Sequence, residues 1–184
     1  MEELKSRYFD ALYEAAKAIN SMLKVDEVLA TIVRAATEAT KAKGCSVMLL
    51  DDERKYLVHT ATYGLSEQYL HKGMIVADRS LADTLKGEAV IVSNVASDPR
   101  LQYPAEAVKE GIGSMLSVPL AARGVVMGAI RIYSSQKRDF SADEIKLPKA
   151  IADLSAIAIQ NSRMHDSLRK VLDTCQRELW HWQP

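Results

Sequence analysis

Apolar residues recur every three or four positions near the N-terminus of this chain, which is the spacing of an amphipathic helix. The pattern predicts a first helix from Glu2 to about Leu23. Its apolar stripe comprises Tyr8, Leu12, Ala15, Ile19 and Met22. A second helix should follow, with Asp26 as its N-cap and Gly44 marking its end.

The C-terminal pattern predicts a single long helix from Ser141 to about Leu179. Ser141 and Glu144 have the spacing of a capping box, and Pro148 should kink the helix or free one carbonyl. In its second half the apolar spacing alternates between three and four, as in a coiled coil. The members are Leu154, Ile157, Asn161, Met164, Leu168, Val171 and Cys175. A polar residue such as Asn161 in this stripe can fix the register and number of partner helices. The two stripes, Tyr8 to Met22 and Leu154 to Cys175, should lie on one side and form a helical bundle across a twofold axis, so we expect a homodimer through the terminal helices.

Between the terminal helices the apolar runs are short, which predicts strands. The runs CSVMLLDD and YLVHTATYG are separated by a short charged link and predict an antiparallel hairpin. A second hairpin is predicted from SMLSVPL and VVMGAIRIYS, with AARG as its turn, and AVIVSNV predicts one more strand. Gly128 in the middle of its strand indicates a close backbone approach or a bulge.

Residues 65–113 alternate between short helical segments and loops. One of these segments, SLADTLKG, should be a short helix capped by Ser80 and stopped by Gly87. Irregular stretches of this length inside a compact domain often carry function. We therefore expect any binding site to draw on this region.

Charge and composition narrow the classes of partner. The 184 residues include 24 Lys and Arg and 24 Asp and Glu, so the formal net charge is zero. Proteins that bind nucleic acid or anionic membrane surfaces usually carry a basic surplus, and no apolar run approaches the roughly 20 residues of a membrane span. The charged N-terminus is unlike a signal peptide. We expect a cytoplasmic protein with two free thiols and neither nucleic acid nor membrane as partner.

With these elements in order, the sequence resembles the GAF domain family. The segments that carry the resemblance are GCSVMLLDDERKYLVHTATYGL, LADTLKGEAVIVSNVASDPRL and the stretch from GIGSMLSVPL to the run DFSADE. The resemblance implies three parts: an N-terminal amphipathic helix over 1–24, a GAF domain over 25–162, and a coiled-coil-like helical extension over 163–184. No single motif is decisive, but their order and spacing together are specific.

The resemblance implies an α+β fold with a twisted antiparallel sheet. N- and C-terminal helices should pack on one face, and a ligand cavity should lie under short helices and loops on the other. GAF domains are mostly sensors of small molecules attached to signalling outputs. The implied function is a sensory or regulatory module that binds a small molecule and relays the event through its terminal helices.

The known ligand classes of the family fit this sequence poorly. The cyclic-nucleotide class resembles a pattern of Asn-Lys followed by Phe, three residues and Asp-Glu, but here Val95 follows Asn94 and only two residues separate Phe140 from Asp143. A bilin is usually held through a cysteine near the cavity. Neither Cys45, at the start of a strand, nor Cys175, in the distal helix, matches that position.

Enzymatic and metal-binding alternatives also lack their residues. The family includes a reductase of free methionine sulfoxide, which depends on several cysteines around the cavity, whereas this chain has two that are far apart. Its four histidines show no paired spacing, and His71, the only plausible axial ligand for haem, is more simply a surface residue. We expect neither an enzyme nor a metal site, and the sequence leaves the cofactor unknown.

If the domain holds a cavity, its walls should come from residues 74–117. The polar candidates for ligand binding are Ser80, Ser93, Asn94, Asp98, Arg100, Tyr103, Ser114 and Ser117. The apolar candidates are Val76, Leu81, Val92, Leu101, Ile112 and Met115. Such a lining would suit a small, partly apolar ligand. The alternative is that these side chains simply fill the interior of a domain without a ligand.

Two functions from different classes therefore remain. The chain is either a ligand-binding sensor module or a structural dimerisation module with a vestigial cavity, and both predict a homodimer. As a sensor it would act on a signalling protein in trans, or it would be a segment of a longer signalling protein. The two hypotheses differ in whether the cavity admits a ligand.

Overall fold

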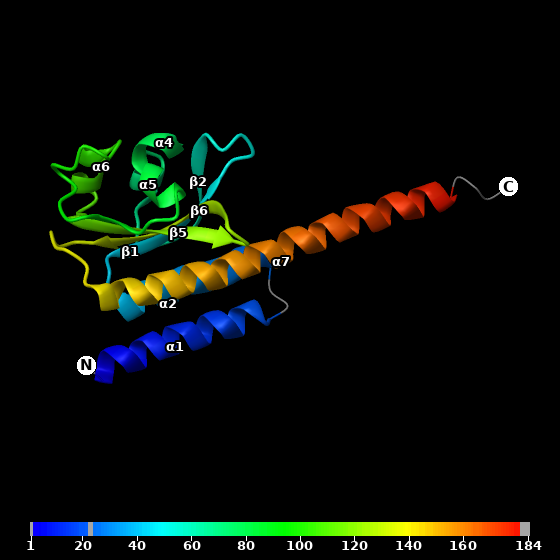
Figure 1. Cartoon of the computed structure of the whole chain (residues 1–184), viewed down its shortest axis with the longest axis horizontal. Coiled ribbons are helices and arrows are strands. Elements are labelled where there is room, and N and C mark those ends of the chain that lie inside the picture. The colour runs from blue at the N-terminus through cyan, green and yellow to red at the C-terminus, as the bar shows by residue number, and fades with distance from the viewer. Residues whose placement is uncertain (1, 22–23, 181–184) are drawn as a thin grey trace.

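The computed structural model describes residues 2–21 and 24–180, apart from the side chains of residues 4, 80 and 176–180. Three long helices lie on one side of a central sheet: α1 (Glu2–Ile19), α2 (Val25–Thr40) and α7 (Ala142–Trp180). Four short helices precede or follow the outer strands: α3 (Glu67–Leu70), α4 (Ala77–Ser80), α5 (Ala82–Leu85) and α6 (Pro104–Lys109). Figure 1 shows α4, α5 and α6 on the side of the sheet opposite to the long helices, and α7 running well beyond the body of the domain.

The sheet contains six strands in the order β3-β2-β1-β6-β5-β4, and every pairing is antiparallel. The strands are β1 (Gly44–Leu50), β2 (Tyr56–Tyr63), β3 (Ile75–Val76), β4 (Val90–Val92), β5 (Ser114–Ala122) and β6 (Val125–Ser134). Both predicted hairpins are confirmed as β1–β2 and β5–β6. The predicted α+β fold, with terminal helices on one face and short helices on the other, is confirmed.

The face of the sheet toward the long helices is predominantly apolar. Alternate residues of the central strands point to it, so one continuous cluster joins the sheet to α1, α2 and α7. From the strands it includes Cys45, Val47, Leu116, Val118, Ile130 and Ile132. The predicted apolar stripe of the first helix also packs against this cluster, through Tyr8, Leu12, Ala15 and Ile19. That stripe is therefore used within the chain, and Met22 lies outside the described residues.

Three predicted helix caps are wrong. Lys24 and not Asp26 caps α2, and Asp26 lies in the first turn, where its charge suits the helix dipole. The same helix ends at Lys41 in the left-handed conformation, because Gly44 already belongs to β1. Ser80 is the last residue of α4, and Leu81 precedes α5, so the predicted single short helix is in fact two separate turns.

Two local predictions are confirmed. The Ser141 backbone N–H donates to Glu144 Oε2 at 2.9 Å and the Glu144 N–H donates to Ser141 Oγ at 3.3 Å, which is a capping box at the start of α7. Gly128 lies next to a bulge in the β5–β6 pairing. A Cβ atom at Gly128 would be 2.0 Å from the Met48 carbonyl oxygen, so only glycine fits this central position.

None of the helices in the described ranges has the length and apolar character that a membrane crossing requires.

Candidate ligand-binding site

A row of polar side chains crosses the face of the sheet that is turned away from the long helices. Register places Arg131 of β6 directly opposite Ser46 of β1 on one side and Ser117 of β5 on the other. Thr62 of β2 extends the row, because it pairs with Ser46. Ser46, Ser117 and Arg131 are buried, and Arg131 is only 4% exposed. A buried guanidinium in a central strand is rare, so this row is the feature of the interior that packing alone does not explain.

Hydrogen bonds join Arg131 and Ser46 of the row to neighbouring side chains. Arg131 Nε donates to Ser117 Oγ at 2.9 Å. The Ser46 and Tyr133 hydroxyls share a hydrogen bond of 3.0 Å. Burial raises the pKa of the Tyr133 phenol, while the nearby Arg131 lowers it. These bonds hold the row in a defined geometry within a low-dielectric interior.

Apolar clusters flank the row on both sides. One contains Tyr69, Val92, Val95, Ala107, Ile112, Met115 and Tyr133. The other contains Met48, Leu57, Ile75, Ala77, Leu81 and Ala129. The interior under the short helices is therefore divided into two apolar compartments with a polar strip between them. This is the composition expected of a small-molecule site, where few polar groups lie among apolar walls.

Two further polar side chains are buried in this layer without hydrogen-bond partners among the described residues. They are His59 of β2, through both ring nitrogens, and Thr84 of α5, through its hydroxyl. Thr84 is fully buried in α5, which packs on β5 and β6. Burial, together with the positive charges of Lys72 and Arg131, lowers the pKa of His59 to about 4. Unpaired buried polar atoms are uncommon and call for an explanation such as a missing ligand.

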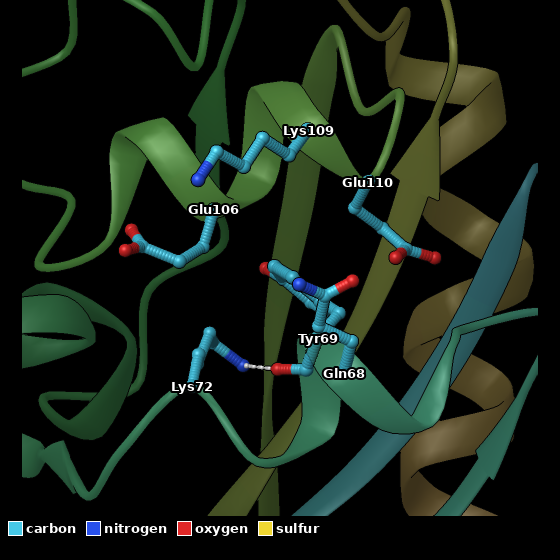
Figure 2. Close-up of a pocket in the computed structure, with 6 residues that line it drawn as sticks. All are labelled: Gln68, Tyr69, Lys72, Glu106, Lys109 and Glu110. Atoms are coloured by element: carbon cyan, nitrogen blue, oxygen red, sulfur yellow. Dashed lines mark hydrogen bonds between the residues drawn. The ribbon is translucent and has the colours of Figure 1, made fainter.

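A pocket of about 250 Å³ opens between α3 and α6, above the polar row. Figure 2 shows its lining, which is Gln68, Tyr69 and Lys72 on one side and Glu106, Lys109 and Glu110 on the other. Lys72 Nζ donates to the Tyr69 carbonyl at 3.0 Å and lies 3.8 Å from the centre of the Tyr69 ring. The Tyr69 ring meets the Tyr133 ring edge to face at 6.0 Å. Tyr69 thus separates the pocket from the buried row.

Lys72 is electrostatically linked to the row. Burial lowers the pKa of Lys72 to about 8, and the charge of Arg131 acts in the same direction. The carboxylates of Glu106 and Glu110 oppose this effect. Arg131 therefore lies close enough to Lys72 and His59 for its positive charge to disfavour their protonated forms.

Glu110 holds the two walls of the pocket together. It accepts a hydrogen bond from the Ser66 N–H at 3.0 Å and another from the Ser66 hydroxyl, and it pairs with Lys43 at 3.3 Å. Ser66 in turn caps α3 by accepting from the Tyr69 N–H at 3.2 Å. The position of Tyr69 is thus coupled to α6 and to the start of β1.

The structure distributes the eight predicted site residues over different environments. Ser117 joins Arg131 in the polar row, and the buried Ser114 donates to the Gln136 carbonyl at 2.8 Å. Ser80 ends α4, and its side chain lies outside the described part of the structure. The remaining five lie between β4 and α6 and bond to groups outside the polar row. These are Ser93 with Asp139, Asn94 with the Ala96 N–H, Asp98 with Arg100, Arg100 with the Ile91 carbonyl, and Tyr103 with the Met74 carbonyl.

Sequence reasoning missed the residues that make the interior polar, namely His59, Tyr69, Lys72, Arg131 and Tyr133. Arg131 carried a signal, because it is a lone charge between Ile130 and Ile132 in a strand that is otherwise apolar. A charged residue in a central strand must face something other than a packed core. The signal from the other four is weaker, since their roles depend on how strands and short helices meet.

Two larger hollows are also present in the described structure. One of about 570 Å³ is formed where α1, α2 and α7 meet, and includes Val28, Asn161 and His165. Another of about 420 Å³ follows the outer edge of β2, and its lining includes His59. In the chain as described, no group of three or more His, Cys, Asp or Glu residues is placed to hold a metal ion. The single interior surface with convergent polar groups is thus the one around Arg131, within the residues that the structure covers.

The two cysteines differ sharply. Cys45 is fully buried on the helical face, and burial raises the pKa of its thiol. Cys175 is exposed on the part of α7 beyond the sheet. Neither contributes to the inner face.

The sheet order and the helix placement together define a single α+β domain in which short helices cover a partly polar face of the sheet. The sequence model of the GAF domain matches residues 23–160. The chain therefore belongs to the GAF domain family.

Three relatives illustrate the range of this fold. The chain is 31% identical over 159 residues to a methyl sulfide methyltransferase-associated sensor from Methanosarcina acetivorans, an alignment that covers 83% of the chain. It spans only 16% of that relative's length. A GAF domain of a phosphoenolpyruvate-protein phosphotransferase from Coxiella burnetii superposes with a TM-score of 0.77 at 20% identity, over 88% of this chain and 98% of that one.

An enzyme shares the fold as well. The free methionine-R-sulfoxide reductase from Neisseria meningitidis, solved with its substrate, superposes with a TM-score of 0.71 at 19% identity, over 86% of this chain and 91% of that one. A GAF domain of a phosphotransferase and a reductase thus have similar architectures. The fold alone does not decide the activity, which has to be argued from the site.

Proposed function

We propose that this chain is a sensory module that binds a small molecule between the inner face of the sheet and the short helices. The observation that carries the proposal is the buried polar row around Arg131, with His59 and Thr84 nearby and unpaired among the described residues. A domain that served only as a scaffold would gain stability by replacing these groups with apolar ones. The similarity to a protein named as a sensor supports the same reading.

The proposal includes a relay through a homodimer. On α7, Ile157, Met164, Leu168 and Val171 are between 48% and 59% exposed, and they share the three-four spacing of a coiled-coil seam. An unpaired apolar stripe of this kind fits a second copy of the same helix. A ligand that favoured one packing of the inner layer would bias the packing of the helices across the sheet, and a signalling partner would read that change.

We also propose that the module is not an enzyme and acts in the cytoplasm. The thiol of Cys45 is buried with a raised pKa, so it is poorly suited to act as a nucleophile. Cys175 is far along α7 from the inner face. Thiol chemistry of the kind that needs an attacking and a resolving cysteine therefore has no support at this site.

A thermal-shift screen of the full chain against a metabolite library tests the sensor function. We expect at least one compound to raise Tm, because a ligand that binds only the folded state stabilises it in proportion to its saturation. If no compound raises Tm by more than about 1 °C, the sensor function is wrong. The alternative, a structural dimerisation module with a vestigial cavity, would then be the better description.

Sedimentation velocity on two variants tests the dimer. Leu168→Glu should convert the dimer to a monomer, while the adjacent Ser167→Glu, off the stripe, should leave it intact. Asn161→Leu should raise Tm and could change the number of helices that associate, since a polar residue in the seam limits stability in exchange for a defined register. A wild-type chain that sediments as a monomer at all concentrations would contradict the relay.

A further inference from the structure

The charged group within the polar row is a cation. Arg131 lies at the centre of the row, and Lys72, from the segment after α3, and His59, from β2, are close enough to it to interact electrostatically. Lowered pKa values of Lys72 and His59 reflect this proximity as well as burial. Arg131 and Lys72 repel one another at this distance and keep His59 neutral, so an anion placed between them would relieve an unfavourable interaction.

Acidic side chains are kept at the outer rim. Glu106 and Glu110 line the pocket between α3 and α6, and Figure 2 shows Glu110 pointing away from Lys72. Glu110 is engaged by Lys43 at 3.3 Å and by Ser66. The pocket mouth therefore carries mixed charge, with Lys72 and Lys109 against the two glutamates, while the inner row is positive.

Neutral donors complete the inner surface. The Ser46, Ser117 and Tyr133 hydroxyls lie in or next to the row, and α5, which packs on β5 and β6, carries the buried Thr84 Oγ1, which has no partner among the residues described. A guanidinium flanked by hydroxyl donors is the arrangement that binds the oxygens of a carboxylate or a phosphate. The two apolar clusters on either side limit the ligand to a compact body.

We propose that the ligand of this module is a small organic anion whose carboxylate or phosphate is bound by Arg131, with Lys72 nearby. This inference rests on the proposed function and adds to it the chemical class of the ligand. Access is from the pocket of about 250 Å³ between α3 and α6, past Tyr69, whose ring covers Tyr133. Binding therefore displaces Tyr69 and, through Ser66 and Glu110, disturbs α3 and α6 together.

The test uses charge-matched probes on the full chain at constant ionic strength set with sodium chloride. The probes are disodium succinate, its neutral isostere succinamide, and sodium phosphate, each at 50 mM. A site that binds a probe with Kd of about 10 mM should raise Tm by about 2–4 °C. We expect succinate, phosphate or both to produce this shift and succinamide to produce none. A response to succinate alone indicates a carboxylate site, and a response to phosphate alone indicates a phosphate site.

Variants locate the effect. Arg131→Met removes the central charge with similar side-chain length, and Lys72→Met does the same at the outer position if the first variant folds poorly. Each variant should either abolish the Tm shift or weaken the apparent affinity for the anion at least fivefold. Arg34→Met is the matched control, because Arg34 is an exposed arginine on α2 on the opposite side of the sheet, and it should respond as the wild type does.

Three outcomes would overturn the inference. If succinamide stabilises the protein as much as succinate does, small-molecule binding stands but the ligand is not selected by charge. If Arg131→Met and Lys72→Met keep the full anion response, the anion binds elsewhere. If no anion raises Tm while a neutral compound from the metabolite library does, the proposed sensor function survives and the anionic class is wrong; if neither does, both fail.

Discussion

The two faces of the central sheet are built from the same strands and differ in almost every other respect. Residues 130 and 132 of β6 point into one continuous apolar cluster with the long helices. Residues 131 and 133, their immediate neighbours, point into a layer of polar groups and small clusters under the short helices. Because successive side chains of a strand point to opposite faces, one strand contributes both to the apolar face that stabilises the fold and to the face that contains polar groups.

The difference indicates where the molecule can change its packing. A continuous core with long helices resists rearrangement, because every side chain is held by many others. Short helices over a divided interior have fewer apolar contacts and are easier to displace locally. A binding event on the inner face can therefore move α3 to α6 while the helical face keeps the domain folded.

The largest expected loss of stability comes from truncating a buried side chain on the helical face of the sheet. Ile130→Ala should lower the free energy of unfolding by about 3 kcal/mol, because Ile130 is fully buried in the large cluster and its neighbours cannot collapse into the space. Ile75→Ala, a buried isoleucine of the inner face, should lose about half as much, since its cluster is small. Urea unfolding of both variants gives the comparison.

The control is Val125→Ala on the same strand as Ile130. Val125 is exposed, so its truncation should change the free energy of unfolding by less than about 0.5 kcal/mol. Equal losses for Ile130→Ala and Ile75→Ala would mean that the two faces do not differ in packing, and the proposed mobility of the short helices would lose its basis.

A second effect, intermediate in size, comes from His59 and depends on pH. His59 stays neutral in the folded state down to its pKa of about 4, whereas in the unfolded chain it takes up a proton near pH 6.5. The unfolded state therefore binds more protons between these values, so stability is lost as pH falls through this window, by an amount on the order of 1–2 kcal/mol for this partly buried group.

His59→Gln should flatten the pH dependence of Tm between pH 6.5 and about 4.5, where most carboxylates are still ionised. His165→Gln, which replaces an exposed histidine on α7, is the control and should follow the wild-type curve. A His59→Gln curve that coincides with wild type over this window would show that His59 is not held neutral inside the protein.

The elements themselves could be read from the sequence because each depends on local periodicity. Alternation gave the strands of both hairpins, and three-four spacing gave the long helices. Helix ends were less accurate. The sequence predicted that Gly44 would end α2, but Lys41 ends it in the left-handed conformation. Gly44 has another role in β1, where a Cβ atom would lie 2.6 Å from the Tyr63 carbonyl oxygen.

The polar row could not be predicted in the same way. It exists because β1, β5 and β6 pair in a register that aligns Ser46, Ser117 and Arg131, and a slip of one residue would turn each side chain to the other face. Ser46 and Tyr133 are 87 positions apart in the chain, so no local pattern links them. The predicted loop residues do not come together at one point in the structure. Their contacts, such as that of Ser93 with Asp139, also depend on tertiary packing, which no local pattern shows.

The smallest expected effect concerns one buried threonine on each face. Thr84 on the inner side has a buried hydroxyl with no partner among the described residues, whereas the hydroxyl of Thr37, in α2, donates to the Val33 carbonyl at 2.7 Å. Valine has nearly the same shape as threonine. Thr84→Val should therefore raise the free energy of unfolding of the ligand-free protein by about 0.5–1 kcal/mol, and Thr37→Val should lower it by a similar amount.

Urea unfolding measures both changes. If the two variants change the free energy of unfolding with opposite signs, the inner face retains a polar group at the expense of stability, as a binding surface does. The same Thr84→Val variant should weaken the response to whichever anion stabilises the wild type, while Thr37→Val should leave that response unchanged. If Thr84→Val destabilises the protein as Thr37→Val does, the Thr84 hydroxyl already has a partner inside the fold. The polar interior would then be satisfied without a ligand, and the two faces would differ only in composition.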